Sequence, residues 1–454
     1  MTETQLRLTD GYFLKGGNDE YVLFHFDEEE TQQLTVNQYE VLRQLQQGTG
    51  VGSVVETFDP DSRDHVREFL EFLREEGVLH ESESPPEEVP PPVDMPRLKF
   101  AHLDITEGCN IACTHCYQEP YLHQGEGLSM DRIRRLVNEL YWMNVESVII
   151  SGGEPFTRPD LFDIIDSIEE RYIRIQDILT NGMLITEETI EAIRTLRSSP
   201  NIVISLNGLT PDSDDAIRGE GTNEACRRGL ERVADSEVEA HVCSVATTLN
   251  LEELPEMYDY VTDLGVSRWR IGLAQVEPDA TDDGYFEIDL EEYQSVGKEI
   301  VEKHLETDTE MSLNVEGLFK QEVFEFGYSE YEPDSTICRY NERSCCVKPD
   351  GTVTPCTLLH DYDCGDVTEE RLEEAWTGEA MREFKGTTVS EVAPDDCRTC
   401  DALEYCGGGC RWWSWNVDET LAGRDPRFCQ NMQYFVDEIL PMVEERTGME
   451  PTPL

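Results

Sequence analysis

Positively charged side chains and long apolar runs are both scarce in this sequence. Only 36 residues are Lys or Arg, and seven of these are Lys, against 96 Asp and Glu, which leaves a formal net charge of -60. Such a surface repels nucleic-acid phosphates and anionic lipid headgroups, so we expect neither a nucleic-acid nor a membrane partner. No stretch approaches the roughly 18 apolar residues of a membrane span, and no secretory signal opens the chain. We therefore expect a cytoplasmic protein.

The acidic residues are spread over every segment of the chain. A dispersed carboxylate coat with little Lys resembles that of proteins from extreme halophiles, where molar salt shortens the Debye length to about 3 Å and screens the self-repulsion. An acidic domain that binds cations or basic partners is the alternative interpretation.

Cysteine, in contrast, is abundant. Thirteen of the 15 cysteines fall within residues 109–116 and 338–429. A chain of 454 residues without an export signal does not need disulfides, so this clustering indicates metal binding. The two outside these fields, Cys226 and Cys243, lie on a predicted helix and a predicted strand, and we expect both to be structural thiols.

The chain divides into four predicted parts. Residues 1–80 show strands at Leu6–Lys15 and Tyr21–Phe26, helices at Val36–Gln47 and His65–Glu75 and a short closing strand, which predicts a winged-helix-like unit. Residues 81–96, with six prolines and five acids, form a linker. Residues 97–310 alternate strands with amphipathic helices, and residues 311–454 are rich in cysteine and weak in periodicity.

Six strand–helix units in the third part predict a parallel sheet whose active-site loops follow the carboxyl ends of the strands. Six units are fewer than the eight of a closed barrel, so we expect an α/β fold with a partial (β/α)6 TIM-like barrel. The predicted strands are Leu98–Ile105, Val145–Ser151, Ile173–Thr180, Ile202–Asn207, Ala240–Thr247 and Trp269–Leu273.

Three cysteines, Cys109, Cys113 and Cys116, form a CxxxCxxC loop directly after the first of these strands. A [4Fe–4S] cluster normally takes four Cys ligands, so three would leave one iron open for chemistry. A zinc site with His115 as fourth ligand is an alternative that the position after the first strand disfavours.

This loop resembles the signature of the radical S-adenosylmethionine (radical SAM) superfamily, with His115 at the usually aromatic position. The resemblance implies that S-adenosylmethionine (SAM) binds the open iron and is cleaved reductively to a 5′-deoxyadenosyl radical. It also implies contacts to SAM from the strand ends that match family motifs. These residues are Gly152, Gly153, Glu154, Pro155, Thr180, Asn181, Ser205, Asn207, Arg218 and Leu273, together with His115.

The second cysteine field has its own ordered spacing. Twelve residues separate Cys338 from Gly351, four separate Gly351 from Cys356, and a CX2CX5CX3C run and a last cysteine follow. This order resembles the SPASM domain, which holds two auxiliary [4Fe–4S] clusters; a zinc ribbon is the alternative.

The resemblance assigns the ligands of the two auxiliary clusters, which would make three clusters in all. Auxiliary cluster I would take Cys338, Cys356, Cys410 and one of the adjacent pair Cys345 and Cys346. Auxiliary cluster II would take Cys397, Cys400, Cys406 and Cys429. Cys364 matches no family position and is treated as spare.

The first 80 residues resemble the peptide-binding chaperone of pyrroloquinoline-quinone biosynthesis, also called a RiPP recognition element. We therefore expect an oxidoreductase that matures a ribosomally made peptide or protein, docks its precursor by strand addition, and receives electrons from a ferredoxin- or flavodoxin-like donor. Thr357 follows Cys356 where sulfatase maturases carry an Asp base, which argues against that activity. A tetrapyrrole-modifying enzyme of haem biosynthesis and a non-catalytic iron–sulfur electron carrier are the alternatives.

Overall fold

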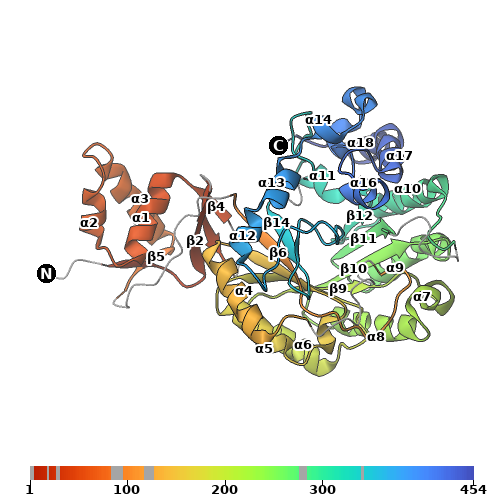
Figure 1. The fold of residues 1–454 in the computed structure, drawn as a ribbon, viewed down its shortest axis with the longest axis horizontal. Helices are drawn as coiled ribbons and strands as arrows, with labels where there is room; N and C mark the ends of the chain where they lie inside the picture. Colours follow the sequence, from red (N-terminus) through yellow and green to blue (C-terminus); the bar gives the residue numbers. More distant parts are fainter. Residues whose placement is uncertain are drawn as a thin grey trace.

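A computed structural model describes residues 5–17, 20–26, 31–82, 96–116, 127–275, 284–338 and 342–453. Figure 1 shows the N-terminal helices on one side of the molecule and a larger α/β body, capped by the C-terminal helices, on the other. Most of the predicted linker lies outside the described residues, and the domain bounds stay predictions. Within the described segments no helix is long and apolar enough to cross a membrane.

The N-terminal unit has its own sheet, helices and hydrophobic core, built around Tyr39, Leu42 and Leu70. Strands β2 (Tyr12–Gly17), β3 (Glu20–His25) and β4 (Thr31–Leu34) form an antiparallel sheet, and β1 (Leu6–Leu8) pairs with β5 (Leu79–Glu81). Between them lie α1 (Val36–Gln46), α2 (Val51–Glu56) and α3 (Arg63–Glu75).

Three details of this unit differ from the sequence prediction. The first predicted strand is split into β1 and β2, because Gly11 turns the chain at a φ of 100°. Strand β4 is TQQL with three exposed residues, and α2 has only six residues, so neither carries a readable apolar pattern. The winged-helix assignment stays a prediction.

The central sheet confirms the expected parallel α/β fold. Its strands β6 to β11 pair in chain order, each parallel to the next. They span β6 (Phe100–Asp104), β7 (Ser147–Ser151), β8 (Arg174–Thr180), β9 (Asn201–Ser205), β10 (Ala240–Ala246) and β11 (Arg268–Leu273). The helices that follow them are α4 (Met130–Trp142), α5 (Leu161–Glu169), α6 (Glu187–Arg194), α7 (Pro211–Arg218), α8 (Thr222–Ala234), α9 (Leu254–Asp263) and α10 (Leu290–Glu306).

The sheet continues past the predicted barrel at both edges. Strand β12 (Ser312–Val315) lies parallel to β11 and carries β13 (Phe319–Lys320), while β14 (Ser344–Val347) lies parallel to β6 and carries β15 (Val353–Thr354). The predicted boundary at residue 310 therefore falls inside one continuous sheet of ten strands.

Short helices fill the rest of the C-terminal part and pack on the sheet. They are α11 (Gln321–Glu325), α12 (Leu372–Trp376), α13 (Glu379–Gly386), α14 (Val389–Val392), α15 (Leu403–Cys406), α16 (Arg411–Asp418), α17 (Pro426–Tyr434) and α18 (Leu440–Thr447). One hydrophobic core joins them to the barrel, since Trp376 and Phe384 belong to the same cluster as the strand residues.

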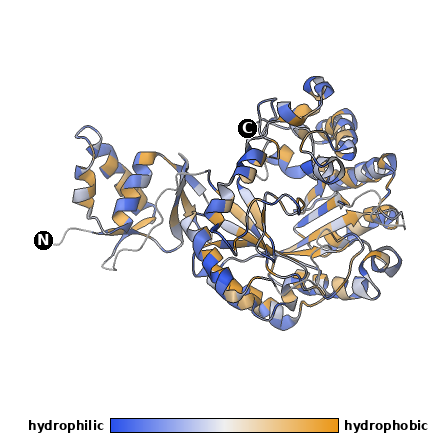
Figure 2. Ribbon diagram, in the orientation of Figure 1, coloured by the Kyte–Doolittle hydropathy of each residue, from blue (hydrophilic) through white to orange (hydrophobic). Residues whose placement is uncertain are grey.

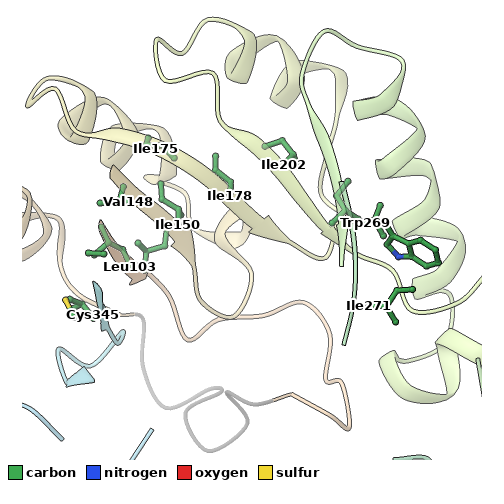
Figure 3. Close-up of a cluster of buried hydrophobic side chains, with 14 of the residues drawn as sticks. Leu103, Val148, Ile150, Ile175, Ile178, Ile202, Trp269, Ile271 and Cys345 are labelled. Atoms are coloured by element: carbon green, nitrogen blue, oxygen red, sulfur yellow. The ribbon is translucent and has the colours of Figure 1, made fainter. Parts of the chain in front are cut away.

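Figure 2 shows apolar colour concentrated on the strands and on the inner faces of the helices. Figure 3 shows part of this core, with Leu103, Ile150 and Ile178 on the adjacent strands β6, β7 and β8 and Trp269 farther along the sheet on β11. These side chains occupy alternate strand positions, so the residues between them face the concave side of the sheet.

The N-terminal unit is fixed to the end of the barrel where the strands begin. Lys15 Nζ donates to the Val145 carbonyl oxygen at 3.1 Å, and Asn144 Nδ2 donates to the Gly16 carbonyl oxygen at 3.1 Å. Arg97 joins the contact by pairing with Glu146 and with Glu20. The carboxyl ends of the strands, where active sites of such sheets lie, face away from this unit.

Candidate active site and auxiliary cysteine sites

The CxxxCxxC loop starts at Cys109, five residues after the last residue of β6, at the carboxyl end of the sheet. Cys109, Cys113 and Cys116 are each partly exposed, so their thiols border the open end of the barrel. The Thr114 backbone N–H donates to the Ile217 carbonyl oxygen at 2.9 Å and anchors the loop to α7.

Two glycines after β7 allow the backbone to pack directly against the start of this loop. The Gly153 N–H donates to the Thr106 carbonyl oxygen, and the Glu154 N–H donates to the Gly108 carbonyl oxygen, both at 2.8 Å. A Cβ on Gly153 would lie 2.4 Å from the Gly108 oxygen, and Gly152 has a φ of 134°. The GGEP segment is therefore a backbone clamp on the cysteine loop.

Glu154 links this clamp to the end of β8. Its fully buried carboxylate accepts hydrogen bonds from Thr180 Oγ1 at 2.9 Å and from the Asn181 backbone N–H at 2.7 Å. Burial raises the pKa of Glu154, and these donors oppose the rise. The Asn181 side chain in turn donates to Asn110 Oδ1, inside the cysteine loop, at 2.7 Å.

Arg218, at the end of α7, connects the hydrogen-bonded residues around Glu154 and Asn181 to the end of β9. Its buried guanidinium donates to the carbonyl oxygens of Ser205 and Asn181 and lies 3.5 Å from Asp214 Oδ2. Burial raises the pKa of the Cys113 thiol, and the positive charge of Arg218 lowers it. Arg218 is therefore a fixed cation beside the cysteine loop.

The remaining predicted SAM contacts are less tightly gathered. His115 lies next to Phe286 with ring centroids 6.0 Å apart, and burial lowers its pKa to about 4. Asn207 accepts from the Val245 N–H and so ties β9 to β10. Leu273 ends β11, where its N–H donates to Glu316 at 3.3 Å, and Pro155 begins a short 3-10 turn.

The donor set of the loop fits an iron–sulfur cluster. Three thiols on one loop are soft ligands of the kind that [4Fe–4S] clusters take. Among the described residues, no three His, Cys, Asp or Glu side chains lie close enough together to hold a metal ion. The fit therefore rests on the donors and on their position at the strand ends.

The C-terminal cysteines form two groups in space. Burial raises the pKa of Cys410, and the nearby thiols of Cys338 and Cys356 raise it further. These three cysteines therefore share one neighbourhood. Burial raises the pKa of Cys356 to about 11, and Cys338 adds to it.

The second group holds the remaining four thiols of the predicted set. Burial raises the pKa of Cys406 to about 11, with further contributions from Cys429, Cys397 and Cys400. These four residues are the ones that the family resemblance assigns to auxiliary cluster II.

The adjacent pair Cys345 and Cys346 points to opposite sides of β14. Cys345 belongs to the hydrophobic core (Figure 3), and burial raises its pKa to about 12. Cys346 Sγ lies 3.5 Å from Asp104 Oδ2, and the neighbouring Cys356 is among the groups that raise its pKa above the effect of burial. Cys364 is buried with Cys345 in the core, where burial raises the pKa of Cys364 and Cys345 raises it further.

The concave face of the sheet holds a row of four residues, Ser205, Cys243, Arg270 and Asn314, across β9, β10, β11 and β12. The sequence predicted Ser205 as a SAM contact and Cys243 as a structural thiol, but gave no signal for Arg270 or Asn314. Ser205 and Arg270 are exposed although they lie within the sheet, which shows that this face is open. Asp214 was also missed, since an acid in so acidic a chain gives no signal; Cys226 is fully buried and donates to the Ser205 carbonyl oxygen.

Comparison with known families matches two parts of the chain. Residues 103–261 match the radical SAM superfamily, and residues 338–401 match SPASM, an iron–sulfur cluster-binding domain. The first range holds the cysteine loop and its clamp, and the second holds Cys338 to Cys400.

Among curated proteins, the chain is similar to enzymes of two kinds. The AdoMet-dependent heme synthase of Nitratidesulfovibrio vulgaris is 25% identical over 345 residues, 73% of this chain and 92% of that protein. The PqqA peptide cyclase of Ruegeria pomeroyi is 25% identical over 358 residues, 76% and 89% of the two chains. The mycofactocin maturase MftC of Mycolicibacterium smegmatis is 24% identical over 328 residues, which are 71% of this chain and 80% of that protein.

Solved structures show the same fold. Streptococcus suis SuiB bound to S-adenosylmethionine superposes with a TM-score of 0.65 at 15% identity, covering 93% of this chain and 99% of that chain. The protein anSMEcpe, with bound AdoMet and the Cp18Cys peptide, gives 0.62 at 18% identity over 76% and 98%. A match over 93% of the chain cannot be reached without residues of the N-terminal unit.

Proposed function

Since the chain is a radical SAM enzyme that carries a SPASM domain, we propose that it modifies a ribosomally made precursor peptide. Bound SAM and its cluster would supply a 5′-deoxyadenosyl radical that removes a hydrogen atom from that peptide. The observation that carries the proposal is the N-terminal unit, whose groove and sheet edge could receive a leader peptide beside the end of the barrel where the strands begin.

The groove lies between α3 and the sheet of the N-terminal unit. It encloses about 190 Å³, and its lining includes Leu23, Gln32 and Phe72 from β3, β4 and α3. Phe72 is 50% exposed, one of few large apolar side chains in the described segments that face solvent. Strand β4 pairs on one side only, so a leader peptide could add a strand there and place an apolar side chain against Phe72.

The concave face of the barrel is suited to a peptide rather than a polyanion. Burial raises the pKa of Cys243, Arg270 lowers it, and Asp177 and Glu316 raise it, so one cation and two acids share this region. A peptide carries both hydrogen-bond donors and acceptors and can pair with each. The acids would repel a ligand with several carboxylates.

Haem biosynthesis is the second candidate, because the AdoMet-dependent heme synthases are among the most similar curated proteins. A tetrapyrrole would have to place its carboxylates near Arg270 and away from Asp177 and Glu316. Binding of a tetrapyrrole to the holoenzyme, with no binding of a peptide, would favour this candidate.

We also propose three [4Fe–4S] clusters, held by the cysteine loop and by the two C-terminal groups. Of the adjacent pair, Cys346 is the better placed fourth ligand of auxiliary cluster I, since it shares a neighbourhood with Cys356 while Cys345 faces the apolar core. Arg218, Glu154 and the ends of β8 and β9 would bind SAM. A ferredoxin- or flavodoxin-like donor and a cytoplasmic, halophilic setting complete the proposal.

The docking step is tested by removing the ring of Phe72. A fluorescent synthetic copy of any short peptide encoded beside the gene is titrated with holoenzyme and with Phe72→Ala. Loss of a half-buried aromatic contact should weaken peptide binding about tenfold, which corresponds to ~1.4 kcal/mol of binding free energy. SAM affinity should not change.

Val36→Ala is the matched control, because Val36 is an exposed apolar residue on α1 outside the groove. Equal peptide affinity in Phe72→Ala, Val36→Ala and the parent would show that the groove does not dock the peptide.

A further inference from the structure

Lys348 is a buried cation in a chain that has only seven lysines. It follows β14 and is 1% exposed. Its Nζ donates to the Thr357 carbonyl oxygen at 2.9 Å and lies 3.3 Å from Asp104 Oδ2. Asp104, which ends β6, is itself buried, so the pair lies between the first barrel strand and the loop of Cys356.

This position puts the ammonium group beside the cysteines of the first C-terminal group. Thr357 is the residue after Cys356, and Cys346 Sγ shares the Asp104 Oδ2 atom with Lys348. Lys348 therefore lies one shared carboxylate oxygen away from the Cys346 thiol and one hydrogen bond away from the residue that follows Cys356. The Lys348 N–H also donates to the Thr352 carbonyl oxygen at 2.8 Å, which fixes the residue at the turn between β14 and β15.

A purely structural role for Lys348 would be to hold two loops together. Buried ion pairs contribute little to stability compared with apolar residues of the same size, because both charges must be desolvated. The reduction potential of an iron–sulfur cluster, in contrast, depends directly on nearby charge and hydrogen bonds. A single buried charge near the thiols therefore has a consequence that the ion pair alone does not.

We propose that Lys348 raises the reduction potential of the cluster held by Cys338, Cys356 and Cys410, and that Asp104 opposes it. Reduction adds one electron and one negative charge to the cluster, and a fixed ammonium group stabilises that added charge. The neighbouring carboxylate disfavours the same added charge.

Burial gives this effect a distinctive salt dependence. Surface charges are screened within about 3 Å at 1 M salt, whereas buried charges are screened much less. Since Lys348 and Asp104 are both buried, the influence of each should persist in molar KCl.

The test uses the full-length chain with Cys109, Cys113 and Cys116 changed to Ala, so that only auxiliary clusters load. Each variant is reconstituted anaerobically in molar KCl, its iron content is measured, and its EPR signals are followed during a redox titration. Lys348→Met should shift one auxiliary signal to a lower potential and leave the other in place. Lys348→Arg should stay near the parent, because it keeps the charge.

Lys303→Met is the control, since Lys303 pairs with Asp259 on the outside of α10 and should shift neither signal. Asp104→Asn is the reciprocal variant and should raise the potential that Lys348→Met lowers. An unchanged potential in a fully loaded Lys348→Met would overturn the proposal. Should that variant fail to load, Asp104→Asn decides: an upward shift upholds the proposal and no shift overturns it. No peptide is used, so the result is independent of the proposed function.

Discussion

Arg218 is the residue that connects most parts of the candidate active site. It bonds the backbone after β8 and the end of β9, pairs with Asp214, and acts on Cys113. Its spacing after the cysteine loop suggested a role from the sequence alone. Asp214 could not be found in this way, because only the fold brings it within reach of the guanidinium group.

We expect Arg218→Gln to weaken equilibrium SAM binding about tenfold or more, because a hydrogen bond to a charged group contributes ~1.5–3 kcal/mol. Binding is measured by calorimetry on the reconstituted protein. Arg228→Gln on the exposed side of α8 is the control and should bind SAM as the parent does. Unchanged affinity in a folded Arg218→Gln would remove this residue from the SAM site.

Gly153→Ala should destabilise the protein by about 1–3 kcal/mol, the usual cost of forcing atoms into a packed region. The added Cβ would meet the Gly108 carbonyl oxygen, which belongs to the backbone and cannot rotate away. Denaturant unfolding and iron loading of the cysteine loop measure the effect. Gly386→Ala, where a Cβ meets nothing within 4 Å, should leave both unchanged; similar behaviour of the two variants would argue against the backbone clamp.

At the level of elements, the six barrel strands and their helices could be predicted, because buried strands such as Ser147–Ser151 are apolar and helices such as Met130–Trp142 have one apolar face. Strands β12 and β14 could not, since each has only four residues. Strand β14 also pairs with β6, which is distant in the chain. The orientation of Cys345 and Cys346 depends on that pairing. It became visible only in the structure.

The contact between the N-terminal unit and the barrel depends on the buried pair Arg97 and Glu146. Glu146→Ala would leave Arg97 buried without this partner, and breaking such a pair costs about 3–5 kcal/mol. We expect a correspondingly lower free energy of unfolding in urea. Asp64→Ala removes an exposed pair on α3 and should change it by less than about 1 kcal/mol. Equal effects of the two variants would show that the unit is not held by Arg97.

For the molecule as a whole, the charge of -60 predicts stability that depends on salt. Self-repulsion disfavours the compact state and is screened as the Debye length falls from about 10 Å at 0.1 M to about 3 Å at 1 M. The Tm of the protein should therefore rise steadily as the KCl concentration increases from about 0.1 M to about 1 M. A Tm that does not respond to KCl would contradict the halophilic interpretation.

The central claim is that the chain performs radical SAM chemistry on a peptide. The most direct measurement is 5′-deoxyadenosine formed from SAM by the anaerobically reconstituted protein in molar KCl with a strong reductant, with and without any short peptide encoded beside the gene. We predict product that increases with the peptide and disappears in Cys113→Ala, which keeps its auxiliary iron. Product that the peptide does not change would contradict the peptide substrate, and no product from a fully loaded protein would contradict the radical chemistry itself.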